Sequence, residues 1–157
     1  MTNFSPAERI ESLKAGALAG FSAFLTFSII LAANSFILAR RFELLASFQI
    51  ERWGWDVGLR LAIAFLSAFL FGVTYRYIVR EDKNLQLKAG AVLAFGLVRA
   101  FAQVDFGLSS QTEKMPAIAL AELLPLAVAG IESIILFVVA GVILEGAIVR
   151  GIVKPFT

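Results

Sequence analysis

The chain has 157 residues, of which 59% are hydrophobic, and 14 basic and 12 acidic residues give it a formal net charge of +2. It contains no cysteine and no histidine, which excludes disulfides, Cys/His metal sites, histidine-ligated haem and Cys- or Ser–His nucleophiles. The small net charge excludes a basic nucleic-acid-binding face. The hydrophobic residues form long blocks, and most charged residues lie between them. This pattern predicts a single integral membrane domain over residues 1–157.

The first hydrophobic block covers residues 15–38 and contains no charged residue. As a helix it is longer than the roughly 30 Å hydrocarbon core of a bilayer, so we expect it to cross the membrane. Ser5, Pro6 and Glu8 stand in the order of an N-cap, a first helical residue and a capping-box acid. The helix is therefore expected to begin near Pro6, in water, and to continue into the membrane.

The second block covers residues 56–77 and has aromatic residues at both ends. Trp53 and Trp55 lie at one end, and Tyr75 and Tyr77 lie at the other. Along a helix, Trp55 and Tyr75 are about 30 Å apart, which is the thickness of the hydrocarbon core. Because Trp and Tyr rings prefer the membrane–water interface, these four residues are predicted to be interface anchors.

The third block covers residues 87–108, and the fourth lies within residues 116–148. The fourth is too long for one straight crossing and contains Pro125. One interpretation places a short interfacial helix at 116–124 and the crossing at 126–144. The alternative is a single kinked helix. Either interpretation yields four spans and an all-α, four-helix transmembrane bundle.

The distribution of basic residues predicts the orientation of the bundle. The side that carries both termini would hold eight of them: Arg9, Lys14, Arg76, Arg80, Lys83, Lys88, Arg150 and Lys154. The opposite side would hold five: Arg40, Arg41, Arg52, Arg60 and Lys114. The positive-inside rule therefore predicts an N-in/C-in protein, with both termini in the cytoplasm or its chloroplast equivalent.

Two short sequences occur twice. Residues 13–17 read LKAGA, as do residues 87–91, and residues 78–80 read IVR, as do residues 148–150. The matches suggest two similar hairpins in the same orientation, which is a parallel repeat. The simpler alternative is that such membrane-entry sequences coincide by chance.

Small residues accompany both copies of LKAGA. Gly16 and Gly20 form a GxxxG pair, and Gly90 and Ala94 form the corresponding small-xxx-small pair. Such pairs let helix backbones approach closely in lipid. We expect them to pack the first and third spans within the bundle. The alternative is a docking surface for another protein.

Arg99 interrupts an otherwise apolar stretch, and its guanidinium stays charged in any environment. Counted from the ends of their spans, Arg99 and Glu132 lie at similar depth in adjacent antiparallel helices. A lone charge at that depth costs several kcal/mol, so the sequence predicts an intramembrane ion pair between them. In one alternative, Arg99 extends unpaired to the interface. In another, it lies on an ion or proton pathway with Asn34, Glu122, Glu132 and Glu145.

Glu145 and the phenylalanine residues are two further features of the sequence. Glu145 lies in a basic neighbourhood that includes Arg76 and Lys88, where a local ion pair is the simplest interpretation. The 15 phenylalanines suit contact with pigments, lipids or partner subunits, although plain lipid contact is the simpler explanation for each one. Neither a catalytic constellation nor a set of cofactor ligands is visible in the sequence, so we predict a non-enzymatic protein without a bound cofactor.

The stretch from Tyr75 to Ala100, YRYIVREDKNLQLKAGAVLAFGLVRA, resembles a family of poorly characterised four-span membrane proteins of cyanobacteria and chloroplasts. In that family an R-Y-x-x-R-x-D/E stretch leads through a polar turn to Q-L-K-x-G and an F-x-L-x-[KR] helix. The corresponding residues here are Arg76, Tyr77, Arg80, Glu81, Gln86, Leu87, Lys88, Gly90, Phe95, Leu97 and Arg99. The resemblance covers about a sixth of the chain. It implies a location in the thylakoid membrane and association with the photosynthetic machinery, and it supplies no catalytic residues.

These observations favour an accessory subunit or assembly factor of a larger photosynthetic membrane complex, such as a photosystem. The expected partners are membrane lipids and that complex, without nucleic acid. The alternative function is a small transporter or channel with Arg99 and Glu132 in its pathway. That function requires a continuous polar stripe through the bundle.

Overall fold

The computed structural model describes residues 5–38, 54–80, 84–109 and 120–156. Every element it describes is a helix: α1 (Pro6–Ala33), its continuation as a π-helix η1 (Asn34–Leu38), α3 (Trp55–Val79), α4 (Leu85–Ser109) and α5 (Leu120–Val149). Four of the helices are long and apolar enough to cross a membrane, so the chain is an integral membrane protein, as its sequence predicts.

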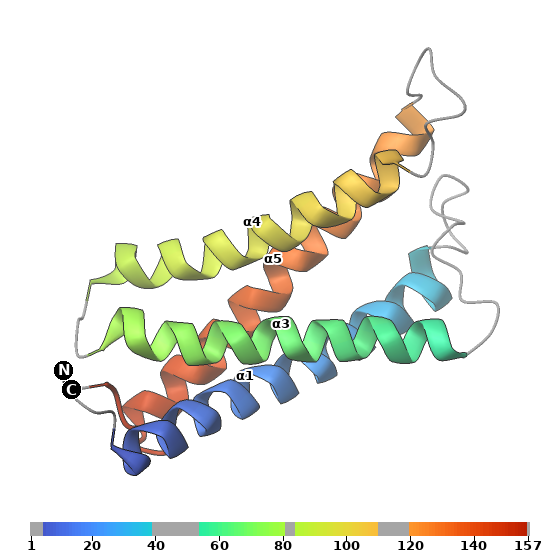
Figure 1. Cartoon of the computed structure of the whole chain (residues 1–157). Coiled ribbons are helices and arrows are strands. Elements are labelled where there is room, and N and C mark those ends of the chain that lie inside the picture. The colour runs from blue at the N-terminus through green and yellow to red at the C-terminus, as the bar shows by residue number, and fades with distance from the viewer. Residues whose placement is uncertain (1–4, 39–53, 81–83, 110–119, 157) are drawn as a thin grey trace.

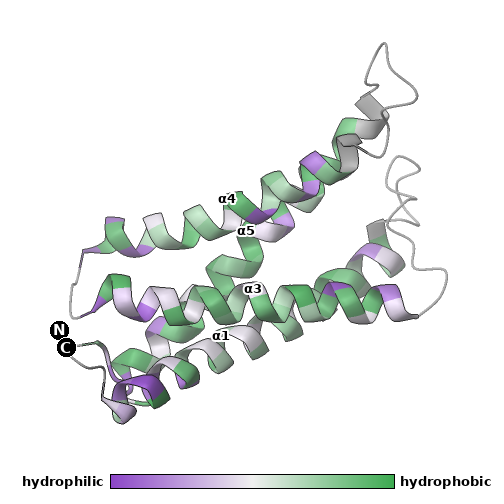
Figure 2. Ribbon diagram, in the orientation of Figure 1, coloured by the Kyte–Doolittle hydropathy of each residue, from purple (hydrophilic) through white to green (hydrophobic). Residues whose placement is uncertain are grey.

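The helices form two antiparallel hairpins, α1–α3 and α4–α5 (Figure 1). Helix α1 also packs against α5, whereas α3 makes few contacts with α4. The start of α1 and the end of α5 lie at the same end of the bundle, which we call the terminal end. Hydrophilic residues gather where α1 begins, and hydrophobic residues dominate the middle of the helices (Figure 2).

Helix α1 begins where its capping residues predict. The Ser5 hydroxyl accepts a hydrogen bond of 3.3 Å from the backbone N–H of Glu8, and Pro6 occupies the first helical position. In a complete capping box the Glu8 carboxylate would bind back to the start of the helix. In this structure that carboxylate binds Arg76 of α3. The first turn of α1 is therefore attached to its neighbouring helix.

Helix α5 ends in a Schellman turn at Gly151, whose φ of +73° favours glycine. The N–H of Ile152 donates to the carbonyl of Ala147 at 2.9 Å, and the N–H of Gly151 donates to that of Ile148 at 3.0 Å. These bonds satisfy carbonyl groups at the end of the helix. The turn leads into residues 152–156, which we call the tail.

Helices α1 and α3 approach each other along a row of small residues. A Cβ atom on Gly72 would lie 2.5 Å from the carbonyl oxygen of Ala15 and 2.7 Å from the Cβ of Ala19, so only glycine fits there. The predicted packing residues Gly16 and Gly20 face side chains of α3 in the same interface. Five alanines of this interface are completely buried: Ala15, Ala19, Ala23, Ala64 and Ala68. Close backbone approach is the usual way in which membrane helices associate.

Three phenylalanine rings join the two hairpins at the centre of the bundle. Phe71 of α3 lies 5.4 Å, between ring centroids, from both Phe95 of α4 and Phe137 of α5. Phe95 and Phe137 are 5.8 Å apart. Phe71 and Phe137 are almost completely buried. We call these three rings the aromatic centre.

The fourth span differs from the preferred prediction. Helix α5 continues through Pro125 as one element, so the proposed break between 116–124 and 126–144 is wrong for the described residues. Proline near the start of a helix removes only one backbone hydrogen bond, and membrane helices tolerate that loss. Residues 116–119 lie outside the described part of the chain.

We predict that Gly72→Ala destabilises the bundle by about 1–3 kcal/mol, because the added methyl group meets the backbone of α1. The matched control is Gly90→Ala, whose Cβ would meet nothing within 4 Å and which should leave stability unchanged or slightly higher. Reversible unfolding in mixed micelles with increasing SDS measures both. Equal stability of the two variants would contradict the described contact between α1 and α3.

Candidate functional site

Polar side chains inside the bundle form two groups on either side of the aromatic centre. The first, at the terminal end, is the Arg76 cluster, which consists of Glu8, Glu11, Ser12, Arg76, Tyr77, Lys154 and Phe156. The second, in the opposite half, is the Arg99 layer, which consists of Phe27, Asn34, Ser67, Arg99, Gln103, Glu132 and Ser133.

The guanidinium of Arg76 is the hub of the first group. Its side chain is completely buried, and it forms an ion pair with the Glu8 carboxylate through Nη2. Nη1 donates to Ser12 Oγ at 2.8 Å and to the Glu8 carbonyl at 3.2 Å, while Nε donates to the Lys154 carbonyl at 2.8 Å. A single side chain of α3 therefore binds both the first turns of α1 and the tail that follows α5.

Aromatic rings cover this cation. The centre of the Arg76 guanidinium lies 5.5 Å from the ring centroid of Phe156 and 5.9 Å from that of Tyr77, within range of cation–π attraction. The two rings pack edge to face at 5.0 Å. The Tyr77 hydroxyl accepts a hydrogen bond from Ser12 at 2.9 Å. Tyr77 thus belongs to the cluster.

A second connection at the terminal end joins the other helices. Lys88 of α4 and Glu145 of α5 form an ion pair, and the hydroxyl of Tyr75 on α3 donates to Glu145 at 3.1 Å. The prediction of a local ion pair for Glu145 is confirmed, with Lys88 as the partner. Arg76, the other basic residue considered, binds Glu8.

In the Arg99 layer, the predicted depth agrees with the packing of α4 on α5. A Cβ atom on Gly130 would lie 3.7 Å from that of Ala100, and Ser133 donates to the side chain of Gln103 at 2.8 Å. Arg99 and Glu132 are the immediate neighbours of Ala100 and Ser133 in the sequence. The two charged residues therefore lie at similar levels on adjacent helices.

The predicted ion pair between Arg99 and Glu132 is nevertheless not formed. Glu132 accepts a hydrogen bond of 2.8 Å from Asn34 of η1. Arg99 extends to α3 and α1, where Nη1 lies 3.5 Å from Ser67 Oγ and the guanidinium lies 5.5 Å from the Phe27 ring. The rotation of each helix about its axis, which counting residues along a span does not specify, turns the two side chains to different neighbours.

Several other predicted site residues also differ from expectation. Tyr75 is buried and Tyr77 is half-buried, and both hydroxyls have hydrogen-bond partners inside the bundle, whereas the sequence predicted interface anchors. Gly90 and Ala94 are exposed, so they do not pack α4 within the bundle. Trp55 is 85% exposed at the start of α3, where an interface anchor would lie. Trp53 lies outside the described residues.

The sequence did not single out Arg76 as a buried residue. A signal was present, because Ala64, Ala68, Gly72 and Arg76 follow one another at intervals of four and therefore share a face of α3. The three small residues mark the face that packs on α1. Extension of that face by one turn leads to Arg76.

The two polar groups are separated by apolar residues. Among the described residues, the aromatic centre and the completely buried Leu136 lie between the Arg76 cluster and the Arg99 layer. A polar path through the bundle is therefore interrupted in this structure.

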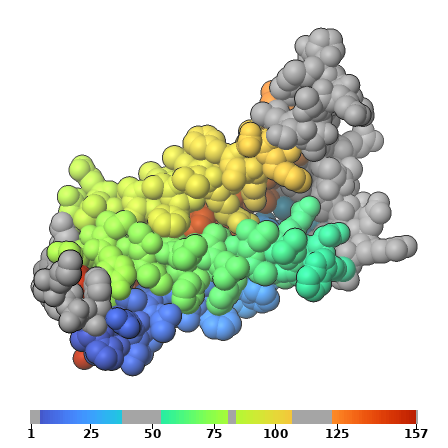
Figure 3. Space-filling model, viewed as in Figure 1, coloured from blue at the N-terminus to red at the C-terminus, as the bar shows by residue number. Residues whose placement is uncertain are grey.

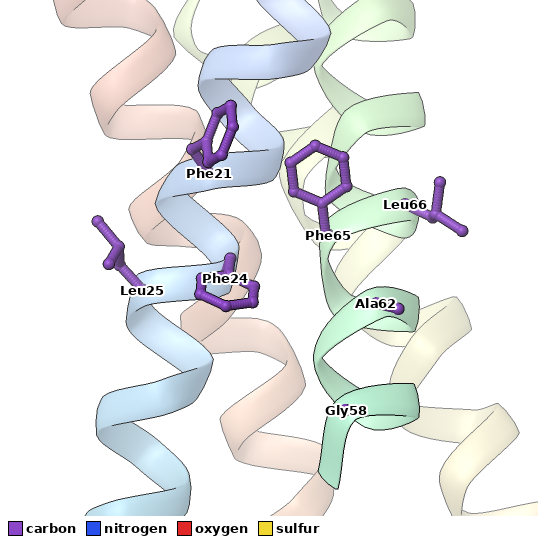
Figure 4. A pocket seen from close by; sticks show the side chains of 7 residues that line it. All are labelled: Phe21, Phe24, Leu25, Gly58, Ala62, Phe65 and Leu66. Atoms are coloured by element: carbon purple, nitrogen blue, oxygen red, sulfur yellow. The ribbon is translucent and has the colours of Figure 1, made fainter. Parts of the chain in front are cut away.

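An apolar groove with a volume of about 610 Å³ lies on the outer face of the α1–α3 hairpin (Figure 4). Gly58 and Ala62 leave the space, and phenylalanine and leucine side chains flank it. Its lining consists of Phe21, Phe24, Leu25, Gly58, Ala62, Phe65 and Leu66. The groove therefore suits a hydrocarbon chain and offers no group for chemistry.

No protein-family model, curated protein or solved structure matches this chain.

We predict that Arg76→Gln destabilises the protein by about 3–5 kcal/mol, because it leaves the Glu8 carboxylate without its cation. The tail should also lose its attachment to α3 and become sensitive to protease. The control Arg9→Gln changes an exposed arginine on α1 and should leave both properties nearly unchanged. Unfolding in mixed micelles and limited proteolysis give the two readouts. A protease-resistant tail in Arg76→Gln would contradict the described attachment.

Double-mutant cycles should separate true partners from residues that only share a level. We expect Asn34 and Glu132, which are hydrogen-bonded, to show a coupling energy of about 0.5–3 kcal/mol. For Arg99 and Glu132, the stability changes of the two single substitutions should add to that of the double substitution within about 0.5 kcal/mol, because no contact joins these residues. The cycles use leucine substitutions and unfolding in mixed micelles. A larger coupling for Arg99 with Glu132 than for Asn34 with Glu132 would restore the ion-pair hypothesis.

Proposed function

We propose that the chain is a non-enzymatic accessory subunit or assembly factor of a larger membrane complex, and that α4 faces its partner. The outer face of α4 carries the proposal, because it is exposed along the described length of the helix. The exposed positions recur in pairs: Leu85 and Gln86, Ala89 and Gly90, Leu93 and Ala94, Leu97 and Val98, Phe101 and Ala102, and Asp105 and Phe106.

The composition of this face suits contact with another helix. Gly90, Ala94, Val98 and Ala102 follow one another at intervals of four along α4, and the small residues Gly90 and Ala94 permit close approach. Among the described residues, a Cβ atom on Gly90 would meet nothing within 4 Å, so packing against them does not account for glycine at this position. A partner helix seated on these residues would account for it.

The repeated LKAGA sequence supports the same conclusion. In the first copy, Gly16 and the following Gly20 are covered by Phe65 and Phe69 of α3. In the second copy, the equivalent face at Gly90 and Ala94 is uncovered. Because the same small-residue pattern is satisfied by a helix in one hairpin, we propose that a helix of another subunit satisfies it in the other.

We further propose that the partner is a photosynthetic complex of the thylakoid membrane, such as a photosystem, and that the chain is oriented N-in/C-in. The support for this setting is the resemblance of residues 75–100 to the family of cyanobacterial and chloroplast membrane proteins. The support for the orientation is the excess of basic residues at the terminal end.

A small transporter is the second candidate, and one observation favours it. The Arg99 layer combines polar side chains from all four spans, and intramembrane charges commonly mark solute pathways. Transport would require the aromatic centre to open, because it separates this layer from the terminal end. Solute flux through reconstituted vesicles would distinguish this candidate.

The first proposal is tested by native-gel separation of gently solubilised host membranes that contain a tagged chain. We expect the wild-type chain to comigrate with a large complex. Gly90→Leu combined with Ala94→Leu should release it as a small species, because two bulky side chains would block close approach to α4. Mass spectrometry of the comigrating band identifies the partner.

The matched control combines Ala62→Leu with Ala127→Leu, two exposed alanines on α3 and α5. It should comigrate as the wild type does, since those positions lie away from α4. Migration of the wild-type chain alone would overturn the proposal. Equal loss of the complex in both double variants would overturn the assignment to α4.

A further inference from the structure

The guanidinium of Arg99 lies deep in the membrane-spanning region. Its nearest polar neighbour is Ser67, the central residue of α3, which runs from Trp55 to Val79. Helical side chains tilt toward the N-terminus of their helix, and the N-terminus of α4 is at the terminal end. Arg99 is therefore inclined away from the opposite interface and into the hydrocarbon region, which argues against extension to that interface.

This cation has few partners where it lies. Nη1 makes one long contact with the neutral Ser67 hydroxyl, and the Phe27 ring provides a π face. Nε is buried without a hydrogen-bond partner. Among the described residues no carboxylate lies within 4 Å, since Glu132 faces Asn34. An unpaired cation in hydrocarbon is costly, and such groups characteristically mark functional sites.

The contrast with Arg76 shows what is missing. Both arginines are in the same bundle, but Arg76 uses Nε, Nη1 and Nη2 and has the Glu8 carboxylate beside it. Arg99 has the corresponding nitrogen atoms and lacks the carboxylate. Nε–H and an adjacent Nη–H together form a fork that matches the two oxygens of a carboxylate.

Arg99 lies at the sparse contact between α3 and α4. Helices α3 and α4 make few contacts, and side chains of α5 are visible between them in the space-filling view (Figure 3). Ser67 lies on α3 and Arg99 lies on α4, so their contact bridges these two helices. A ligand would therefore enter sideways from the membrane, between these two helices.

We propose that Arg99 binds the carboxylate of a single-chain amphiphile, such as a fatty acid, within the bundle. The guanidinium fork binds the carboxylate, and the apolar tail lies between α3 and α4. A two-chain phospholipid is less suitable, because its two chains need more room between α3 and α4 than a single chain does. A water-soluble anion has no tail with which to reach this depth.

The test is titration of the purified full-length chain, in a nonionic detergent, with oleate labelled with ¹³C at the carboxyl carbon. We expect one bound carboxylate resonance per chain. Arg99→Gln should weaken binding by at least about tenfold, because it removes the charge-assisted hydrogen bonds. Arg60→Gln removes an exposed arginine of α3 with the same change in net charge and should bind as the wild type does.

Arg99→Lys keeps the charge, loses the fork and should bind several-fold more weakly than the wild type. If Arg99→Gln does not fold, Arg99→Lys alone tests whether the Arg99 fork binds the carboxylate. Wild-type affinity in Arg99→Lys and Arg99→Gln, or no bound resonance in the wild type, would overturn the proposal. Displacement of oleate by phosphatidylglycerol would assign the site to a lipid phosphate instead. Displacement by acetate would show that no tail is needed, and either displacement would overturn the fatty-acid assignment.

Discussion

A guanidinium cannot lose its proton, so Arg76 must find acceptors wherever α3 carries it. In this bundle it is buried, and its acceptors come from the first turns of α1 and from the tail after α5. Arg76 thereby joins three segments that are distant in sequence, namely the start of α1, the end of α3 and the tail. The contact depends in turn on the small residues of α3, because Gly72 lets α1 approach closely enough for Glu8 and Ser12 to reach the arginine. The buried charge of Arg76 can therefore be paired only if α1 and α3 pack closely.

The two arginines divide the bundle into unlike halves. Around Arg76 every nitrogen of the guanidinium is engaged, and the surrounding segments fit closely. Around Arg99 the contacts are long and few, and the hairpins diverge toward the end opposite the termini (Figure 1). A membrane protein that needs both a stable scaffold and a place for a ligand or partner can separate them along the membrane normal. The sparse contact beside Arg99 belongs to the less tightly packed half, whereas the uncovered face of α4 runs along the described length of that helix.

The extent of the first three helices could be read from the sequence, since the apolar blocks and the Ser5 cap determine where these helices cross and begin, whereas Pro125 gave a false signal of a break in the fourth. The rotation of each helix about its own axis could not be read in the same way. Arg99 and Glu132 were correctly placed in depth and wrongly paired, because a turn about the axis sends each side chain to a different neighbour. The same limit explains the inward-pointing Tyr75 and the exposed Gly90, whose surroundings are decided by contacts among four helices. On α1 and α3, where small residues recur every four positions, the sequence did carry a signal for the buried face.

The carbonyl group that completes the Arg76 site belongs to Lys154, which lies 78 residues further along the chain. During synthesis on the ribosome, the α1–α3 hairpin is therefore present before this acceptor exists. Arg76 then has only its partners on α1, and it gains the last one when α5 has crossed the membrane and the turn at Gly151 has returned the tail to the start of α1. Closure of the terminal end is therefore possible only after all four helices have been made and inserted.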